Sequence, residues 1–289
     1  MQVSDASGEI RGAAVAGGRN RTELAHFLRN RRARILPQHV GLPFGRRRRT
    51  PGLRREEIAV LAGLSPTWYT YLEQGRDIRP SSEVLESLAR VLKLTEPERR
   101  YLHLLADGRP RSSPVPAPRP SEAVLPQLVA SVGQGAMPVY AIDAVADICS
   151  WNELATVWYT DFAWLPPAHR NILWWMLLAS EARERIVDWE DETRGLLASF
   201  RLATAGRPRE RRYQELVTEL RSDSPEFREW WNEHDVCDQQ TRTRRFRLPG
   251  GQVRLARLVV LQTVDTANSV VLHLPLDGTD SANGADLTN

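Results

Sequence analysis

The residue types that most often perform catalysis or bind metals are scattered along this chain. The two cysteines, Cys149 and Cys237, form no Cys-x-x-Cys pair, and none of the six histidines takes a metal-binding spacing such as His-Glu-x-x-His. No Gly-x-Ser-x-Gly elbow, phosphate-binding loop or dinucleotide-binding glycine pattern occurs. We therefore expect no metal site, no cofactor and no catalytic residue. The histidines are His26, His39, His103, His169, His234 and His273.

Two short groups could nevertheless suggest hydrolysis. Gly250-Gly251-Gln252 resembles the hydrolytic loop of peptide release factors, but it follows Pro249 between two β-prone segments, so we expect a hairpin turn there. An acidic cluster lies further upstream, and consecutive helical residues point in different directions, so its carboxylates cannot converge. We interpret the cluster as a solvated helix face. Its members are Asp188, Glu190, Asp191 and Glu192.

Arginine is the residue type whose distribution is informative. Residues 1–109 hold 20 Lys and Arg against 12 Asp and Glu, a net charge of +8, whereas residues 110–289 hold 19 against 24, a net charge of −5. A basic front part suits a polyanion, and the guanidinium group suits phosphate oxygens and guanine edges. Four adjacent arginines could contact phosphate or a narrow minor groove, or could form a solvated loop. They are Arg46, Arg47, Arg48 and Arg49.

The length of 289 residues predicts two domains, and the hydrophobic fraction of 42% is sufficient for two cores. No apolar run approaches the roughly 18 to 20 residues that a membrane helix needs, and the N-terminus lacks the apolar centre of a signal peptide. We therefore expect a cytoplasmic protein with reduced cysteines and no membrane partner.

A proline-rich segment divides the chain. Residues 108–120 contain prolines at a spacing that neither a helix nor a central strand tolerates, so we expect a semi-rigid linker. Before it we predict a flexible arm over residues 1–20 and a domain over 21–107. After it we predict a domain over 121–276 and a disordered tail over 277–289.

Residues 21–107 have the pattern of five helices in an all-α domain. Two of the helices are joined by a tight Gly-Leu-Ser connection, as a helix-turn-helix requires. In the second of these, Ser65 is a suitable N-cap and Pro66 suits the first helical position. The period places Tyr69 and Leu72 inside the domain. This leaves Thr67, Trp68, Thr70 and Tyr71 towards the exposed face that reads bases, and we expect Arg55 to contact a phosphate.

The run AVLAGLSPTWYTYLEQGR, followed by RPSSEVLESLARVLKL, resembles the helix-turn-helix of the XRE, or lambda-repressor-like, family. The residues that carry this resemblance are Leu61 to Gly63, Ser65, Glu73, Gly75, Arg76, Pro80 and Ser81. It implies that Ser65, Thr67, Thr70 and Tyr71 face bases and phosphates, and that Glu73 has a structural role. The arginine-rich connection before the second helix is longer than in the short members of that family.

Residues 121–276 predict an α+β domain of the PAS type. Short β-prone segments come first, a helical block follows, and β-prone segments end the domain. Its landmarks resemble those of the MmyB-like transcription regulators, in which a helix-turn-helix precedes a PAS-like ligand-binding domain. Those landmarks include Trp151-Asn152, Asp161-Phe162, Arg170-Asn171, Asp188-Trp189, and Ser224 with Glu226, Phe227, Trp231 and His234.

The resemblance implies a hydrophobic pocket for a small, fatty-acid-like or otherwise apolar molecule. All but one of the nine tryptophans lie in this part of the chain, although aromatic residues at helical spacing can equally fill a core. The candidate lining residues are Trp151, Asn152, Trp158, Phe162, Asn171, Trp174, Trp175 and Trp230.

These observations predict a regulator rather than an enzyme. We expect it to bind double-stranded DNA as a homodimer, with one recognition helix in the major groove of each half-site, and to sense a small molecule. Two alternatives remain open for the large domain: a hydrolase fused to a DNA-binding anchor, or a protein-interaction module.

Overall fold

The structure is a computed structural model that describes residues 6–43, 50–107, 124–132, 137–205, 210–238, 241–263 and 268–276. The predicted linker over 108–120, the predicted tail over 277–289 and residues 1–5 of the predicted arm lie outside these ranges. Spatially the chain forms two compact units. The first comprises residues 1–112, 201–214 and 230–237, and the second comprises residues 113–200, 215–229 and 238–289.

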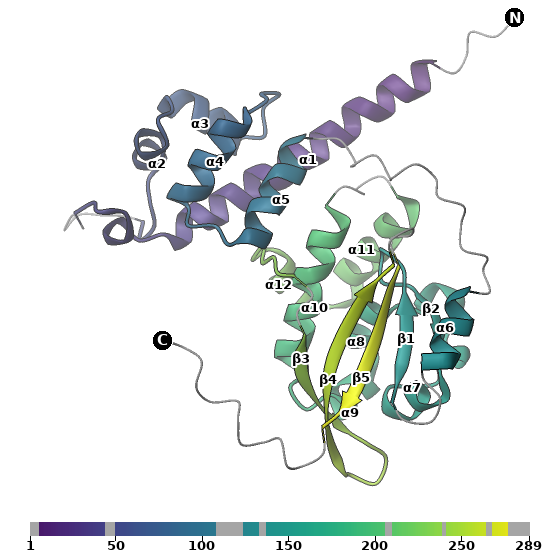
Figure 1. The fold of residues 1–289 in the computed structure, drawn as a ribbon. Helices are drawn as coiled ribbons and strands as arrows, with labels where there is room; N and C mark the ends of the chain where they lie inside the picture. The colour runs from purple at the N-terminus through teal and green to yellow at the C-terminus, as the bar shows by residue number, and fades with distance from the viewer. Residues whose placement is uncertain are drawn as a thin grey trace, which may run out of the picture. The chain divides into compact units, whose positions relative to one another are not determined.

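The first unit contains all the helices of the N-terminal part (Figure 1). They are α1 (Ala6–Arg34), η1 (Pro37–Val40), α2 (Arg55–Ala62), α3 (Pro66–Glu73), α4 (Ser82–Val91) and α5 (Glu96–Asp107). Their shared core includes Phe27, Leu28 and Tyr69, all fully buried, and Ala205 and Val236 from later in the chain also belong to it. The first unit is therefore not made by the N-terminal residues alone.

The turn between α2 and α3 follows from local sequence. Gly63 ends α2 with a φ of 72°, a left-handed conformation that favours glycine, and Leu64 N–H donates to Ala59 O over 2.8 Å. Ser65 then begins α3, because its Oγ accepts from Trp68 N over 3.1 Å and Pro66 occupies the first helical position. The predicted helix-turn-helix connection is present, with Tyr69 and Leu72 buried as expected.

Helix α1 is longer than the sequence pattern suggested. Residues 6–20, expected to form a flexible arm, continue the helix that was predicted to begin after Asn20. Extension of a nucleated helix adds one hydrogen bond for each residue fixed. Helix propensity does not account for it, because residues 6–20 hold four glycines as well as four alanines.

The second unit contains a five-stranded antiparallel sheet with the order β2-β1-β5-β4-β3, drawn in Figure 1 with α6 beside β1 and β2. This sheet with its helices has the α+β, PAS-like arrangement that the sequence predicted. The strands are β1 (Val139–Ile142), β2 (Ile148–Trp151), β3 (Arg242–Arg247), β4 (Val253–Gln262) and β5 (Ser269–Pro275). The helices are α6 (Val124–Val132), α7 (Glu153–Trp158), η2 (Phe162–Trp164), η3 (Pro167–His169), α8 (Ile172–Leu178), α9 (Ser180–Arg185), α10 (Trp189–Thr204), α11 (Arg211–Asp223) and α12 (Pro225–Trp231). The last residues of α10, the first of α11 and the last of α12 belong to the first unit.

Alternation along the strands gives the sheet two different buried faces. Val139 and Ala141 of β1 pack with Val270 and Leu272 of β5 against Val129 of α6, which forms a small aliphatic core. Residues of opposite parity point to the other face, where Tyr140 of β1 pairs with Val271 and lies near His273 of β5. That second face holds the aromatic residues of the domain.

The connection between β3 and β4 is a tight hairpin. Gly250 and Gly251 have φ values of 89° and 85°, and Gly251 N–H donates to Leu248 O over 3.0 Å. Glycine adopts positive φ angles more readily than other residues do, so the glycine pair allows the tight turn. The hairpin turn that the sequence predicted is therefore present.

Candidate DNA-binding surface and ligand-binding core

The predicted recognition helix α3 presents one accessible face. Ser65 and Thr67 are exposed, and Trp68, Thr70 and Tyr71 are half-buried. Thr70 Oγ1 donates to Pro66 O over 2.8 Å, so its hydroxyl can still accept a hydrogen bond but has no proton left to donate. The Tyr71 ring lies under the Arg76 guanidinium, whose central carbon is 4.0 Å from the ring centroid. The candidate base-reading residues thus lie together on one face of a short helix.

A buried carboxylate fixes this helix from the opposite side. The Glu73 side chain is completely buried and accepts from Tyr69 Oη over 2.9 Å, Arg32 Nε over 2.5 Å and Arg55 Nε over 2.6 Å. Burial opposes its ionisation, but the hydrogen bonds and charges of the two arginines outweigh burial and lower the pKa of Glu73. Glu73 therefore has the structural position that the family resemblance implied.

Arginines from α1 extend this anchor to neighbouring segments. Arg29 donates to the backbone oxygen of Glu73 over 3.1 Å, and Arg32 Nη1 donates to Leu53 O over 2.7 Å. One helix, α1, thereby holds both the end of α3 and the segment that enters α2.

Arg55, the predicted phosphate ligand, is tied to Glu73 only through Nε and remains 46% exposed, so part of its guanidinium is accessible. Arg46, Arg47, Arg48 and Arg49 lie outside the described residues. Two exposed residues beyond the predicted set, Gln74 and Arg76, lie beside Tyr71, and Arg76 Nε donates to Gln74 Oε1 over 3.0 Å. The Glu-x-Gly-Arg pattern contained this arginine, but the sequence alone did not place it against Tyr71.

In the second unit, four of the candidate ligand residues gather around Tyr159, which follows α7. Its ring meets the Trp175 ring with 5.3 Å between centroids, and the Phe246 ring of β3 at 5.2 Å. Phe162 lies 6.2 Å from Tyr159 and 5.6 Å from Trp151. Trp158 continues the cluster, because its ring lies 4.9 Å from that of Phe246. Trp151, Trp158, Phe162 and Trp175 are therefore parts of one aromatic assembly.

A chain of buried polar groups crosses this assembly. His273 donates from Nδ1 to Pro138 O over 3.0 Å, which leaves Nε2 to accept from Tyr159 Oη over 2.6 Å. The same hydroxyl oxygen accepts from Arg244 Nη1 over 2.8 Å, and Arg244 Nε donates to Glu192 Oε2 over 2.7 Å. A charged pair and a neutral histidine are thus joined through one tyrosine.

Glu192 corrects the interpretation of the acidic cluster as a solvated helix face. It is 7% exposed and pairs with both Arg244 and Arg242, because it lies on the side of α10 that faces the sheet. Asp188, by contrast, pairs at the surface with Arg245 Nε over 2.8 Å. The neighbours in the cluster do point in different directions, but one of those directions is inward.

Burial and charge set the ionisation states in this polar chain. Burial, with a smaller contribution from the Arg244 charge, lowers the pKa of His273 to about 3, so the ring is neutral. Burial also raises the pKa of Tyr159 well above its ordinary value. For Arg244, burial opposes the charge, but Tyr159 and Glu192 outweigh burial and raise the pKa of the guanidinium.

A further buried donor lies on Trp175, whose ring meets that of Tyr159. Trp175 is completely buried, and its Nε1 has no hydrogen-bond partner among the residues that the structure describes. A buried indole N–H normally has an acceptor, so this donor is an exception among those that the structure describes.

The other candidate ligand residues lie elsewhere. Asn152 and Asn171 begin α7 and α8, where their Oδ1 atoms accept from Ala155 N and Leu173 N, each over 3.0 Å. The Trp174 ring stacks on His169 at 4.2 Å, and its Nε1 donates to Glu219. Trp230 belongs to the first unit. The structure therefore brings together four of the eight candidates.

Among the described residues, no group of three or more histidine, cysteine or acidic side chains is placed to hold a metal ion. Among the helices that the structure describes, none combines the length and the apolar character that crossing a bilayer requires.

Comparison with protein families supports the division of the chain by function. Residues 23–102 match a family model described as a helix-turn-helix domain, and residues 124–287 match the model of the MmyB-like transcription regulator ligand binding domain. A comparison with curated proteins found no match. Because the second model spans more than half of the chain, the protein belongs to the family with the MmyB-like ligand-binding domain and is a DNA-binding transcription regulator with a ligand-sensing domain.

Proposed function

We propose that the protein is a cytoplasmic regulator that binds a specific operator as a homodimer through α3, and that a small apolar molecule bound beside Tyr159 adjusts this binding. The observation that carries the DNA-binding half is the accessible face of α3, which is held from behind by the buried Glu73. A recognition helix needs such fixed geometry, because base contacts are selective only when side chains are held in place.

The buried face of the sheet supports the ligand half. Aromatic rings surround Tyr159, and Trp175 Nε1, which has no hydrogen-bond partner among the described residues, adds a directed donor beside these rings. Ligand sites combine these features, with apolar walls for affinity and a few polar groups for orientation. An apolar molecule with one hydrogen-bond acceptor, such as a fatty-acid-like compound, fits this chemistry.

Selection of DNA from a random-sequence pool by the purified protein tests the first half. We expect an enriched site with two related half-sites. Tyr71→Ala should bind all sequences with similar affinity, because a residue that faces bases is removed while the groups that bind phosphate remain. Tyr69 is unsuitable as a control because it is buried, so Thr218→Ala, an exposed change outside the first unit, serves instead. Equal selectivity of Tyr71→Ala and the control would contradict the assignment of α3.

The four arginines at 46–49 have a separate test. Replacing them together by glutamine should weaken binding to every DNA alike. The slope of log affinity against log salt concentration should also become shallower, by about 0.9 for each phosphate that the arginines no longer neutralise. An unchanged salt dependence would assign these arginines to a solvated loop.

Native mass spectrometry of the full chain tests the ligand half. We expect an apolar molecule of defined mass, whose release or addition changes the affinity for the selected DNA. Trp175→Phe should lower the retention of that molecule, because Phe keeps an aromatic ring but removes the N–H. A chain that is empty and insensitive to added apolar compounds would instead favour a protein-interaction role.

A further inference from the structure

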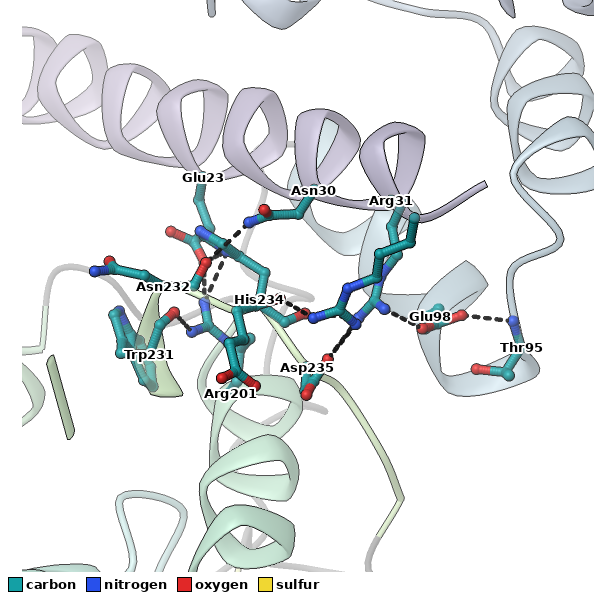
Figure 2. A network of polar contacts seen from close by, with 12 residues as sticks. Glu23, Asn30, Arg31, Thr95, Glu98, Arg201, Trp231, Asn232, His234 and Asp235 are labelled. Carbon is teal, nitrogen blue, oxygen red and sulfur yellow. Dashed lines mark hydrogen bonds and ion pairs between the residues drawn. The ribbon is translucent and has the colours of Figure 1, made fainter. Parts of the chain in front are cut away.

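Within the first unit, a short segment that the ligand-binding family model covers is bonded to helix α1 (Figure 2). Arg201 is 2% exposed, pairs with Glu23 and stacks on the Trp231 ring with 3.8 Å between the guanidinium carbon and the ring centroid. His234 Nδ1 lies 3.0 Å from Glu23 Oε1 and 3.1 Å from Arg201 Nη1. Tyr101 of α5 donates to the same Glu23 oxygen over 2.9 Å.

A second set of bonds continues along α1. Arg31 Nη2 donates to His234 O over 2.8 Å, and Arg31 Nη1 pairs with Glu98 of α5 over 3.0 Å. Asn30 donates to Asn232 O over 2.9 Å, as Figure 2 also shows. His234 adopts a φ of 55°, which is uncommon for a residue other than glycine, so its carbonyl is held towards α1 at some conformational cost.

Charge and burial make the interaction at Glu23 strong. Burial opposes ionisation of Glu23, but His234 and Arg201 outweigh burial and lower its pKa to about 2. The carboxylate is thus charged beside a buried arginine, and removing the Glu23 carboxylate leaves the buried Arg201 guanidinium without this counter-charge.

The same helix holds α3 through the next residue. Arg31 bonds to the turn at His234, whereas Arg32 bonds to Glu73 at the end of α3. Neighbouring residues of α1 thus join a segment of the ligand-binding region to the helix that faces DNA.

We propose that the cluster of Glu23, Arg201 and His234 is a latch, through which residues 201–205 and 230–236 of the ligand-binding region hold α1 rigid and so hold α3 in its DNA-binding position. The latch rests on the proposed function, in which α3 reads DNA. Opening the latch loosens α1 and weakens DNA binding without any change in the residues that touch DNA.

Hydrogen exchange of the full chain tests the latch directly. In Arg201→Gln, the amides of α1 and of α3 should exchange about tenfold faster than in the wild type, as expected when a region opens more often. The milder Glu23→Gln should act in the same direction. The double variant should add little to either change, because both remove one interaction.

Arg183→Gln is a control with the same kinds of contact at a half-exposed position. Arg183 also pairs with a glutamate, Glu226, and stacks on a tryptophan, Trp189, at 3.7 Å, but it lies in the second unit. Its replacement should leave exchange in α1 and α3 unchanged. The latch is overturned if hydrogen exchange in α3 is unchanged in Arg201→Gln. It is also overturned if Arg201→Gln and Arg183→Gln change this exchange equally.

Affinity for the DNA selected by the wild type provides the second readout. Arg201→Gln should bind that DNA about fivefold or more weakly, within the usual range of coupling between sites, and Arg183→Gln should bind it like the wild type. If α3 exchanges faster in Arg201→Gln but the affinity of this variant for the DNA is not reduced, the latch does not control DNA binding. If the wild type selects no DNA, the proposed function fails, and the exchange comparison alone decides whether the latch exists.

Discussion

Single residues in this protein combine burial with charge, and Glu73 is the clearest case. Its carboxylate is fully buried and is shared by two arginines and a tyrosine. Such a group stabilises a fold only while every partner is present, because each remaining charge is costly once the pair is broken.

Glu73→Gln should therefore lower the free energy of unfolding by about 3 kcal/mol, the usual order for removal of one partner of a buried pair. Chemical denaturation at neutral pH measures this change. Glu56→Gln, at an exposed position of α2, is the control and should change stability by less than about 0.5 kcal/mol. Equal stability of the two variants would show that the Glu73 network contributes nothing.

His273 gives a prediction for pH. Its pKa is about 3 in the folded protein and about 6.5 in the unfolded chain. Below pH 6.5 the unfolded chain therefore takes up a proton that the folded protein does not, and stability falls as the pH is lowered from 6.5 towards 3. The contribution is about 1.4 kcal/mol per pH unit for this one group.

The variant His273→Gln removes that proton while keeping one donor and one acceptor. Between pH 6.5 and pH 5, its stability should depend less steeply on pH than that of the wild type. The exposed His39→Gln is the control and should keep the wild-type slope. Parallel curves for wild type and His273→Gln would contradict a neutral buried ring.

At the scale of elements, local sequence predicted the helix-turn-helix almost completely. Gly63, Ser65 and Pro66 determine where α2 ends and α3 begins, and these signals act over a few residues. The buried Glu192 could not be predicted in the same way. Its partner Arg244 lies 52 residues away along the chain, and no local pattern encodes that meeting.

Packing of α1 against the segment before α2 yields a further prediction. A Cβ at Gly52 would lie 2.3 Å from Ala33 O, a backbone atom that cannot move away by itself. Gly52→Ala should cost about 2 kcal/mol or more in the free energy of unfolding, as overpacking does. Gly18→Ala in α1, where no atom lies within 4 Å of the added Cβ, should instead stabilise the helix by about 0.5 to 1 kcal/mol. Thermal unfolding of both variants measures the difference, and equal melting temperatures would refute the close approach.

Across the whole molecule, the order of the chain and the division into units do not coincide. Residues 201–214 and 230–237 belong to the first unit although the ligand-binding family model covers them. Ala205 and Val236 are part of the core that the helix-turn-helix uses. Composition and periodicity indicate where domains lie along a sequence, but they do not reveal which segment completes another core.

A fragment of residues 1–112 should consequently be less stable than the same residues in the full chain. It lacks the apolar side chains of Ala205 and Val236 and leaves Glu23 without Arg201. Exchange of α1 amides, compared between the fragment and the intact protein, measures the difference. Equal protection in both would show that the later segments contribute nothing to the first unit.

Helices α10 and α12 each begin in the second unit and end in the first. This limits the positions at which such a regulator can be fused to part of another one. A gene fusion made at the proline-rich segment would give the DNA reader a foreign sensor and would leave Glu23 and Arg31 facing unrelated side chains. In a working hybrid, Glu23 and Arg31 should therefore come from the same parent protein as Arg201 and His234. These four positions should be exchanged as one set.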